Sequence, residues 1–179
     1  LPAAVAALFG SHIGAKLNML ANEDVLRYIL IVAVVVIAVF IIVKKDFGSN
    51  DTSGKYSHTK MAVMSVIIGL VIGCYDGFFG PGTGTFLILA FSAIAGFDLL
   101  TSSGNAKLVN LASNVSAFIT FALAGSIVWS IGIPAAVFGI AGNIAGSHIA
   151  LKKGSKFIRP MFVLVLSILL IKLIYDSVF

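Results

Sequence analysis

Residues 74–85 read Cys-Tyr-Asp-Gly-Phe-Phe-Gly-Pro-Gly-Thr-Gly-Thr and separate two apolar runs, Met61–Tyr75 and Thr85–Phe97. Glycine and proline are the strongest helix breakers, so this stretch predicts a break between two helices over Asp76–Gly84. The backbone amides of such a break have no helical acceptors and must find other partners. What those partners are depends on the solvent around the apolar runs.

That solvent is lipid. The 179 residues are 59% hydrophobic and only 11% charged, against about 25% charged in an ordinary soluble domain. A water-soluble globule is excluded, because a chain of this length leaves much of its surface exposed and has no core large enough to hide so much apolar area. The eighteen glycines fit closely packed membrane helices, and the single cysteine, Cys74, excludes a disulfide framework and a Cys-based zinc site.

We therefore predict an all-α polytopic membrane protein with about seven transmembrane or half-membrane helices. The apolar runs are Pro2–Leu20, Val25–Val43, Met61–Tyr75, Thr85–Phe97, Asn105–Ala124, Ile131–Leu151 and Pro160–Val178. A full span needs about 20 residues, so the third and fourth runs are short. They fit either two full helices joined by a tight turn or a hairpin of half-helices, and both arrangements return the chain to the side it left.

The positive charge lies in two short loops. Eight of the twelve basic residues are Lys44, Lys45, Lys55, Lys60, Lys152, Lys153, Lys156 and Arg159. Basic loops stay on the cytoplasmic side of a membrane, so we expect 44–60 and 152–159 to be cytoplasmic and Phe179 to lie outside, in an inner membrane. This distribution argues against a nucleic-acid partner. It does not decide whether the protein forms a homo-oligomer.

A short internal repeat indicates how the spans are organised. Gly10-Ser11-His12-Ile13 recurs as Gly146-Ser147-His148-Ile149, with an odd number of expected passes between the two copies, as in inverted-topology transporters. We therefore expect residues 1–43 to end a first inverted half, 44–60 to form a cytoplasmic basic linker and 61–179 to form the second half. The matching break would fall in an amino-terminal portion of about 75 further residues, which would be this chain's partner.

The break itself predicts an anion site. The run from Gly82 leads into a helix beginning near Thr85, and a helix amino terminus offers free N–H groups and a positive dipole end. The candidate substrate-binding residues here are Asp76, Gly77, Gly80, Pro81, Gly82, Thr83 and Gly84. The alternative is a tight interhelical turn in which Asp76 is only a cap.

A second polar cluster follows in residues 101–114. Ser103, Lys107, Asn110 and Asn114 are spaced by four, three and four residues, which places them on one stripe of a helix. Such a stripe must face protein or water, and the candidate substrate-binding residues in it and beside it are Asn105, Lys107, Asn110 and Asn114. The alternative is an interhelical hydrogen-bond seam with Lys107 reaching toward a helix end. No catalytic residue, metal site or cofactor is expected.

The run Tyr75–Gly84, followed by Asn105-Ala106-Lys107 and Asn110, resembles the TauE/SafE sulfite exporter family, in the subgroup of probable membrane transporters. The resemblance places the chain in the carboxy-terminal two thirds of such a protein. It implies an inner-membrane permease of two inverted halves that handles sulfite or small organosulfur anions. Alternating access, with Asp76 coupling transport to a proton, is the mechanism that we expect.

Two other functions compete with this one. A passive anion channel uses the same broken helices and lysine, and only coupling or saturation separates it from a carrier. An intramembrane aspartyl protease would use the Tyr75-Asp76 pair, but its only partner in the apolar core is Asp98, which lacks glycine flanks and is expected to cap the helix that begins near Leu99. The protein is therefore not expected to be an enzyme.

Overall fold

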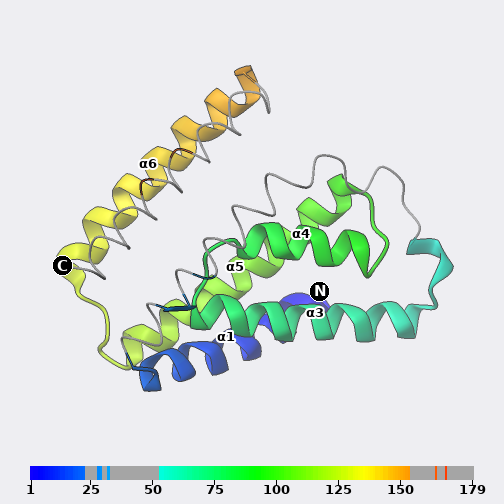
Figure 1. Cartoon of the computed structure of the whole chain (residues 1–179), viewed down its shortest axis with the longest axis horizontal. Helices are drawn as coiled ribbons and strands as arrows, with labels where there is room; N and C mark the ends of the chain where they lie inside the picture. The colour runs from blue at the N-terminus through cyan, green and yellow to red at the C-terminus, as the bar shows by residue number, and fades with distance from the viewer. Residues whose placement is uncertain (23–27, 30–31, 33–52, 154–163, 165–167, 169–179) are drawn as a thin grey trace. The chain divides into compact units, whose positions relative to one another are not determined.

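The structure is a computed structural model that describes residues 1–22, 28–29, 32, 53–153, 164 and 168. Every regular element in these ranges is a helix, as expected (Figure 1). They are α1 (Pro2–Leu20), the short 3-10 helix η1 (Ser53–Lys55), α3 (His58–Phe78), α4 (Thr83–Ala93), α5 (Leu99–Leu123) and α6 (Trp129–Lys153). The predicted spans Val25–Val43 and Pro160–Val178, the basic residues of loop 152–159 beyond Lys153, and Phe179 lie outside the described residues.

Four of the described helices, α1, α3, α5 and α6, are long and apolar enough to cross a membrane. The expectation of a polytopic membrane protein is confirmed to that extent, while the count of seven and the inverted repeat stay predictions. Contacts divide the chain into a first unit, Leu1–Ala124, and a second unit, Gly125–Phe179. The helices α1, α3, α4 and α5 belong to the first unit, and α6 belongs to the second.

The third and fourth apolar runs form one long and one short helix, so neither expected arrangement, two full helices or two half-helices, holds for both. Helix α3 has 21 residues and is a full span, because it begins earlier than Met61 and continues past Tyr75. The hydroxyl of Ser57 caps its amino terminus by accepting a hydrogen bond from the Lys60 amide at 3.3 Å. Helix α4 has 11 residues and reaches about 16 Å, too short to cross alone.

Helices α1 and α3 are parallel and packed backbone to backbone. A Cβ built on Gly69 would lie 2.1 Å from the carbonyl oxygen of Ala3, and one built on Gly77 would lie 2.1 Å from that of Ser11. The two contacts occur in the same order along both helices, which gives the parallel direction seen in Figure 1. Small residues four apart permit this approach, as the glycine content predicts.

Gly14 offers the sharpest test of this packing. A Cβ on Gly14 would lie 2.0 Å from the carbonyl oxygen of Cys74, and backbone cannot yield as a side chain can. We expect Gly14→Ala to lower the unfolding free energy by about 1–3 kcal/mol, measured as thermal unfolding of the purified protein in detergent. The matched control is Gly104→Ala on α5, where a Cβ meets nothing within 4 Å. Equal stability of the two variants would contradict the packing.

The core of the first unit is small and lies where α4 packs against α3 and α5, with alanines of α1 completing the cluster. Leu87 and Phe91 of α4 are fully buried, and they join Ile68, Ala106 and Val109 from α3 and α5. Figure 1 shows α4 running back along α3 toward the connection that enters α5. The core therefore fixes the short helix, and with it the break at its amino end, against α3 and α5, which are both long and apolar enough to cross a membrane.

Candidate functional site

The helix break is narrower than the sequence predicts. Helix α3 continues to Phe78 and α4 begins at Thr83, so only residues 79–82 are non-helical. The prediction of a break over Asp76–Gly84 is therefore wrong at both ends, as is the helix start near Thr85. The amide of Phe79 still donates to the Tyr75 carbonyl at 2.8 Å, which carries the helix past Asp76 and leaves that residue in the last turn of α3.

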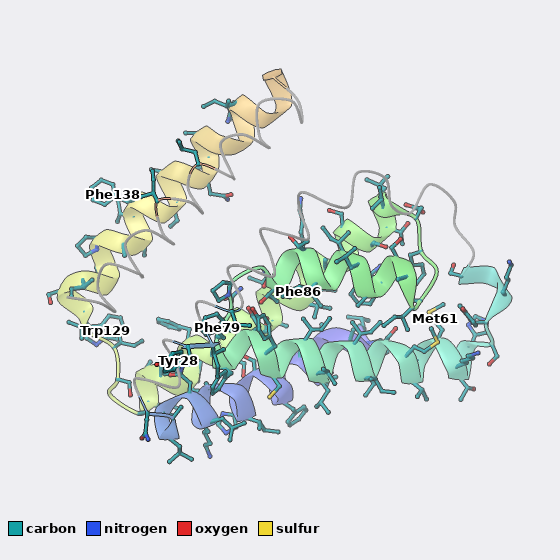
Figure 2. All side chains as sticks on the ribbon, viewed as in Figure 1. Tyr28, Met61, Phe79, Phe86, Trp129 and Phe138 are labelled. Carbon is teal, nitrogen blue, oxygen red and sulfur yellow. The ribbon has the colours of Figure 1, made fainter. Side chains whose placement is uncertain are left out.

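Two glycines and one tyrosine shape the break. Gly80 and Gly82 have φ values of +88° and +81°, in the left-handed region that favours glycine. The Tyr75 hydroxyl donates to the Pro81 carbonyl at 2.7 Å. The Tyr75 ring meets the Phe86 ring edge-on at 5.5 Å between centroids, and Figure 2 shows Phe79 and Phe86 beside the turn. Tyr75 therefore connects the last turn of α3 to the break and to α4.

The amino end of α4 presents backbone donors. The amides of Thr85 and Phe86 donate to the Gly82 carbonyl at 2.9 and 3.1 Å, and the Thr83 amide donates to Gly80 at 3.2 Å. The amides of Gly82 and Gly84 have no backbone acceptor among the residues that the structure describes. A Cβ on Gly84 would meet nothing within 4 Å, so the space beside its backbone is open to a ligand.

Asp76 faces α5 across the helix interface. One of its carboxylate oxygens, Oδ2, accepts a hydrogen bond from the hydroxyl of Ser113, which is fully buried. The Thr83 hydroxyl, which donates to the Gly80 carbonyl at 2.6 Å, also interacts with the carboxylate. Asp76 thus joins the end of α3, the start of α4 and the middle of α5, and it does not cap a helix.

The polar stripe of α5 lies beside the face that α5 buries. The buried face carries Ser102, Ala106, Val109 and Ser113, each one residue before a member of the predicted stripe. One residue turns a helix by about 100°, so Lys107 and Asn114 are exposed in this unit and Asn110 is half-buried. The stripe is therefore real as a helical face, and the first unit leaves it uncovered.

The amide side chains of this stripe are partly engaged within α5. Asn114 Nδ2 donates to the carbonyl of Asn110 at 2.8 Å and lies 3.2 Å from its side-chain oxygen, Oδ1. Asn105 Nδ2 donates to the carbonyl of Thr101 at 2.9 Å. Lys107 forms no ion pair with Asp76 in the described part of the chain. The two predicted clusters thus meet at Ser113, whereas the described contacts do not bring Lys107 to Asp76.

Gly77 has a different place from the other residues predicted around the break. It is buried against the Ser11 carbonyl of α1, so its role there is close helix packing. Gly80, Pro81, Gly82, Thr83 and Gly84 form the turn and the first residues of α4. The structure therefore divides the stretch that the sequence treats as one site into a packing glycine, Gly77, and the turn that leads into α4.

Two buried hydroxyls were missed by sequence reasoning. Ser113 donates to Asp76, and the Ser11 hydroxyl donates to the carbonyl of Ser113 at 2.6 Å. Ser113 stands next to Asn114 but off the polar stripe, so helical periodicity did not select it. Ser11 belongs to the repeated Gly-Ser-His-Ile motif, which was the available signal.

Two further titratable groups of the first unit, His12 and Asp98, are engaged elsewhere. His12 Nδ1 lies 2.9 Å from the Thr120 hydroxyl on α5. Asp98 accepts from the Thr101 amide and hydroxyl, each at 2.8 Å, and these bonds hold the pKa of Asp98 below its usual range. The expected cap at Asp98 is confirmed. Its carboxylate is thus committed to the start of α5 and does not pair with Asp76 as a protease dyad requires.

Comparisons with known proteins agree with the geometry. A family model described as sulfite exporter TauE/SafE matches residues 1–173. The chain is 38% identical over 168 residues to the probable membrane transporter protein YfcA of Escherichia coli K12, covering 94% of this chain and 61% of that protein. It is 36% identical over 176 residues to the probable membrane transporter protein ORF9 of Sinorhizobium, covering 98% and 66%.

A probable membrane transporter protein of Haemophilus influenzae is 30% identical over 168 residues, covering 94% of this chain and 65% of that protein. No solved structure matches the chain significantly. The chain therefore spans about two thirds of the length of these relatives or somewhat less. The expected family is confirmed, while the family match runs through residues 1–173 and assigns the chain to neither end of a member.

Proposed function

The chain belongs to the sulfite exporter TauE/SafE family, and from this premise we propose that the full-length protein is a membrane permease for a small anion, either sulfite or an organosulfur anion. It is a carrier that works by alternating access and is not an enzyme. The relatives named as probable membrane transporters support this class. The substrate comes from the family description.

One observation carries the proposal. The amides of Gly82 and Gly84 lie at the amino end of α4 without backbone acceptors among the described residues, in a chain whose long helices are apolar enough to span a membrane. Uncompensated amides are costly in hydrocarbon, so they favour a ligand or a water-filled cavity. The positive end of a helix dipole favours an anion as that ligand.

The polar face of α5 supplies the rest of the site. Lys107 contributes positive charge, and Asn105, Asn110 and Asn114 orient the anion with their amide groups. Asp76, at the junction of α3, α4 and α5, takes up the coupling proton. Lys107 and Asn114 are exposed in the first unit, and a charged residue within a membrane span requires protein or water beside it.

The arrangement in the membrane follows the charge pattern. The loops 44–60 and 152–159 lie in the cytoplasm, the carboxy terminus lies outside, and the membrane is the inner membrane. A first inverted half, with its own glycine-rich break, completes the transport path. Helices α1 and α3 are parallel, which is the direction that a single returning span between them requires.

A substitution at Gly84 tests whether the helix break binds an anion. Because its Cα faces open space, Gly84→Ala adds a methyl group beside the free amides without a clash inside the protein. We expect methanesulfonate to bind the variant about ten- to a hundredfold more weakly, as for loss of a hydrogen bond to a charged group. The measurement is isothermal titration calorimetry on the purified full-length protein.

The matched control is Gly54→Ala in η1, where a Cβ also meets nothing within 4 Å and where no anion site is proposed. Both variants should unfold at the temperature of the unmodified protein. Unchanged binding in Gly84→Ala would remove the amino end of α4 from the site. A saturable flux would then still favour a carrier, whereas a non-saturating flux would favour the channel.

A further inference from the structure

Ser113 has one hydroxyl proton and two acceptors within reach. Its Oγ contacts Asp76 Oδ2 across the α3–α5 interface, and it lies 3.0 Å from the carbonyl oxygen of Asn110 on its own helix. Ser113 is fully buried, so water does not compete for this proton. A hydroxyl donates one hydrogen bond at a time, and the charge of Asp76 decides which acceptor receives it.

The two charge states of Asp76 give two hydrogen-bond patterns. An ionised carboxylate can only accept, so Ser113 donates to it. A protonated carboxyl can instead donate to Ser113 Oγ, and the Ser113 hydroxyl is then free to turn to the Asn110 carbonyl. No bond is broken other than hydrogen bonds, and the proton stays on Asp76.

The Asn110 carbonyl already has a side-chain donor. Asn114 Nδ2 donates to it at 2.8 Å, and the backbone amide of Asn114 occupies it as the normal partner in an α-helix. A carbonyl oxygen has two lone pairs. The Ser113 hydroxyl and the Asn114 side chain therefore compete for the lone pair that the helical hydrogen bond does not use. When the Ser113 hydroxyl turns to this carbonyl, it releases the Asn114 side-chain amide.

We propose that Ser113 is a positioning residue that couples the proton on Asp76 to anion binding by releasing the Asn114 amide. This inference rests on the proposed function and adds to it the route between the two sites. Asn114 is exposed on the polar face of α5, so its released Nδ2 is available to an anion there. Protonation and anion binding then favour each other, as linkage requires.

Contacts around Ser113 hold its backbone in place while its hydroxyl can turn. The Ser11 hydroxyl of α1 donates to the Ser113 carbonyl at 2.6 Å, which holds this turn of α5 in place. Besides Asp76, the titratable and charged groups of the packed helices are His58 and Lys60 in the first turn of α3, Cys74 and Tyr75 near its end, His12 and Lys16 on α1, and Lys107 on α5, and Thr83–Ala93 of α4 contains none. His12 is engaged with Thr120 and Tyr75 with Pro81, and the Ser113 hydroxyl contacts Asp76.

The test measures methanesulfonate binding by isothermal titration calorimetry on either side of the Asp76 titration. A sulfonate stays ionised throughout, so any change with pH belongs to the protein. The titration itself is followed by the infrared carbonyl band of the protonated carboxyl that is lost in Asp76→Asn. We expect the unmodified protein to bind about tenfold more tightly when Asp76 is protonated.

Ser113→Ala should bind with the same affinity at both pH values while keeping the infrared band, and Ser113→Thr should restore the difference. Asn114→Ala, an exposed change, should reduce the affinity at low pH to that at high pH. The matched control is Ser102→Ala, another fully buried serine of α5, whose hydroxyl lies 3.4 Å from the Phe97 carbonyl and should leave the difference intact.

A tenfold difference that persists in Ser113→Ala or in Asn114→Ala would overturn the coupling route while leaving the proposed function in place. Loss of the affinity difference in Ser102→Ala as well would also overturn the coupling route, because removing any buried hydroxyl of α5 would then abolish the difference. Absence of binding by the unmodified, folded protein at both pH values would instead reject the proposed anion site, and with it the coupling.

Discussion

Asp76→Asn is expected to remove the response of anion uptake to an imposed pH gradient and to leave anion binding in place. Asparagine has nearly the shape of aspartate and still accepts from the Ser113 hydroxyl, but it cannot take up a proton. A gradient of one pH unit supplies about 1.4 kcal/mol per coupled proton, or about a tenfold accumulation. The variant should lose that accumulation and only equilibrate its substrate.

The assay is uptake of labelled sulfite into proteoliposomes that contain the full-length protein, at equal amounts of inserted protein. Asp76→Glu is the conservative control, since it retains a titratable group at the junction of α3, α4 and α5. Asp98→Asn is the second control, because the Asp98 carboxylate caps α5 at its exposed end. Gradient-driven accumulation that survives in Asp76→Asn would assign the coupling proton to another group.

Lys107→Gln is expected to raise the half-saturation concentration for the anion by about ten- to a hundredfold. The change keeps a polar side chain and removes one charge, and hydrogen bonds to charged groups contribute about 1.5–3 kcal/mol. Lys107 is exposed in the first unit and unpaired with Asp76, so its charge is available to an anion. The measurement is the concentration dependence of initial uptake rates.

Lys107→Arg should retain most of the affinity, because the charge is kept. The matched control is Lys60→Gln in the first turn of α3, where the ammonium lies over the Tyr56 ring, 4.7 Å from its centroid, away from the break. An unaltered half-saturation concentration in Lys107→Gln would remove this residue from the site and return it to the reading of a lysine at a hydrogen-bond seam.

The sequence was sufficient for the helical class and for the position of the break. Apolar runs and the glycines and proline of 77–84 mark both features directly. Helix ends were less accurate, because the polar first turn of α3 depends on the Ser57 cap and its last turn contains Asp76. Hydropathy does not register either effect. The predicted apolar run Met61–Tyr75 was therefore shorter than α3, and its length resembled that of the run that became α4.

Only part of the candidate site could be predicted, because sequence periodicity does not show which helices contact each other. Helical periodicity correctly placed Lys107 and Asn114 on one face of α5, but it cannot say which helix that face meets. The contact of Asp76 with Ser113 joins α3 to α5, in a unit where α1 and α3 approach closely through Gly69 and Gly77. That approach is a tertiary property, and only the four-residue spacing of the glycines hinted at it.

The most direct test of the central claim is uptake of labelled sulfite by the full-length protein in proteoliposomes, with and without an imposed pH gradient and with methanesulfonate as competitor. A coupled anion carrier should show saturable uptake that the gradient drives and the sulfonate inhibits. Absence of uptake by folded, correctly inserted protein, or a non-saturating flux indifferent to the gradient, would contradict a coupled anion carrier.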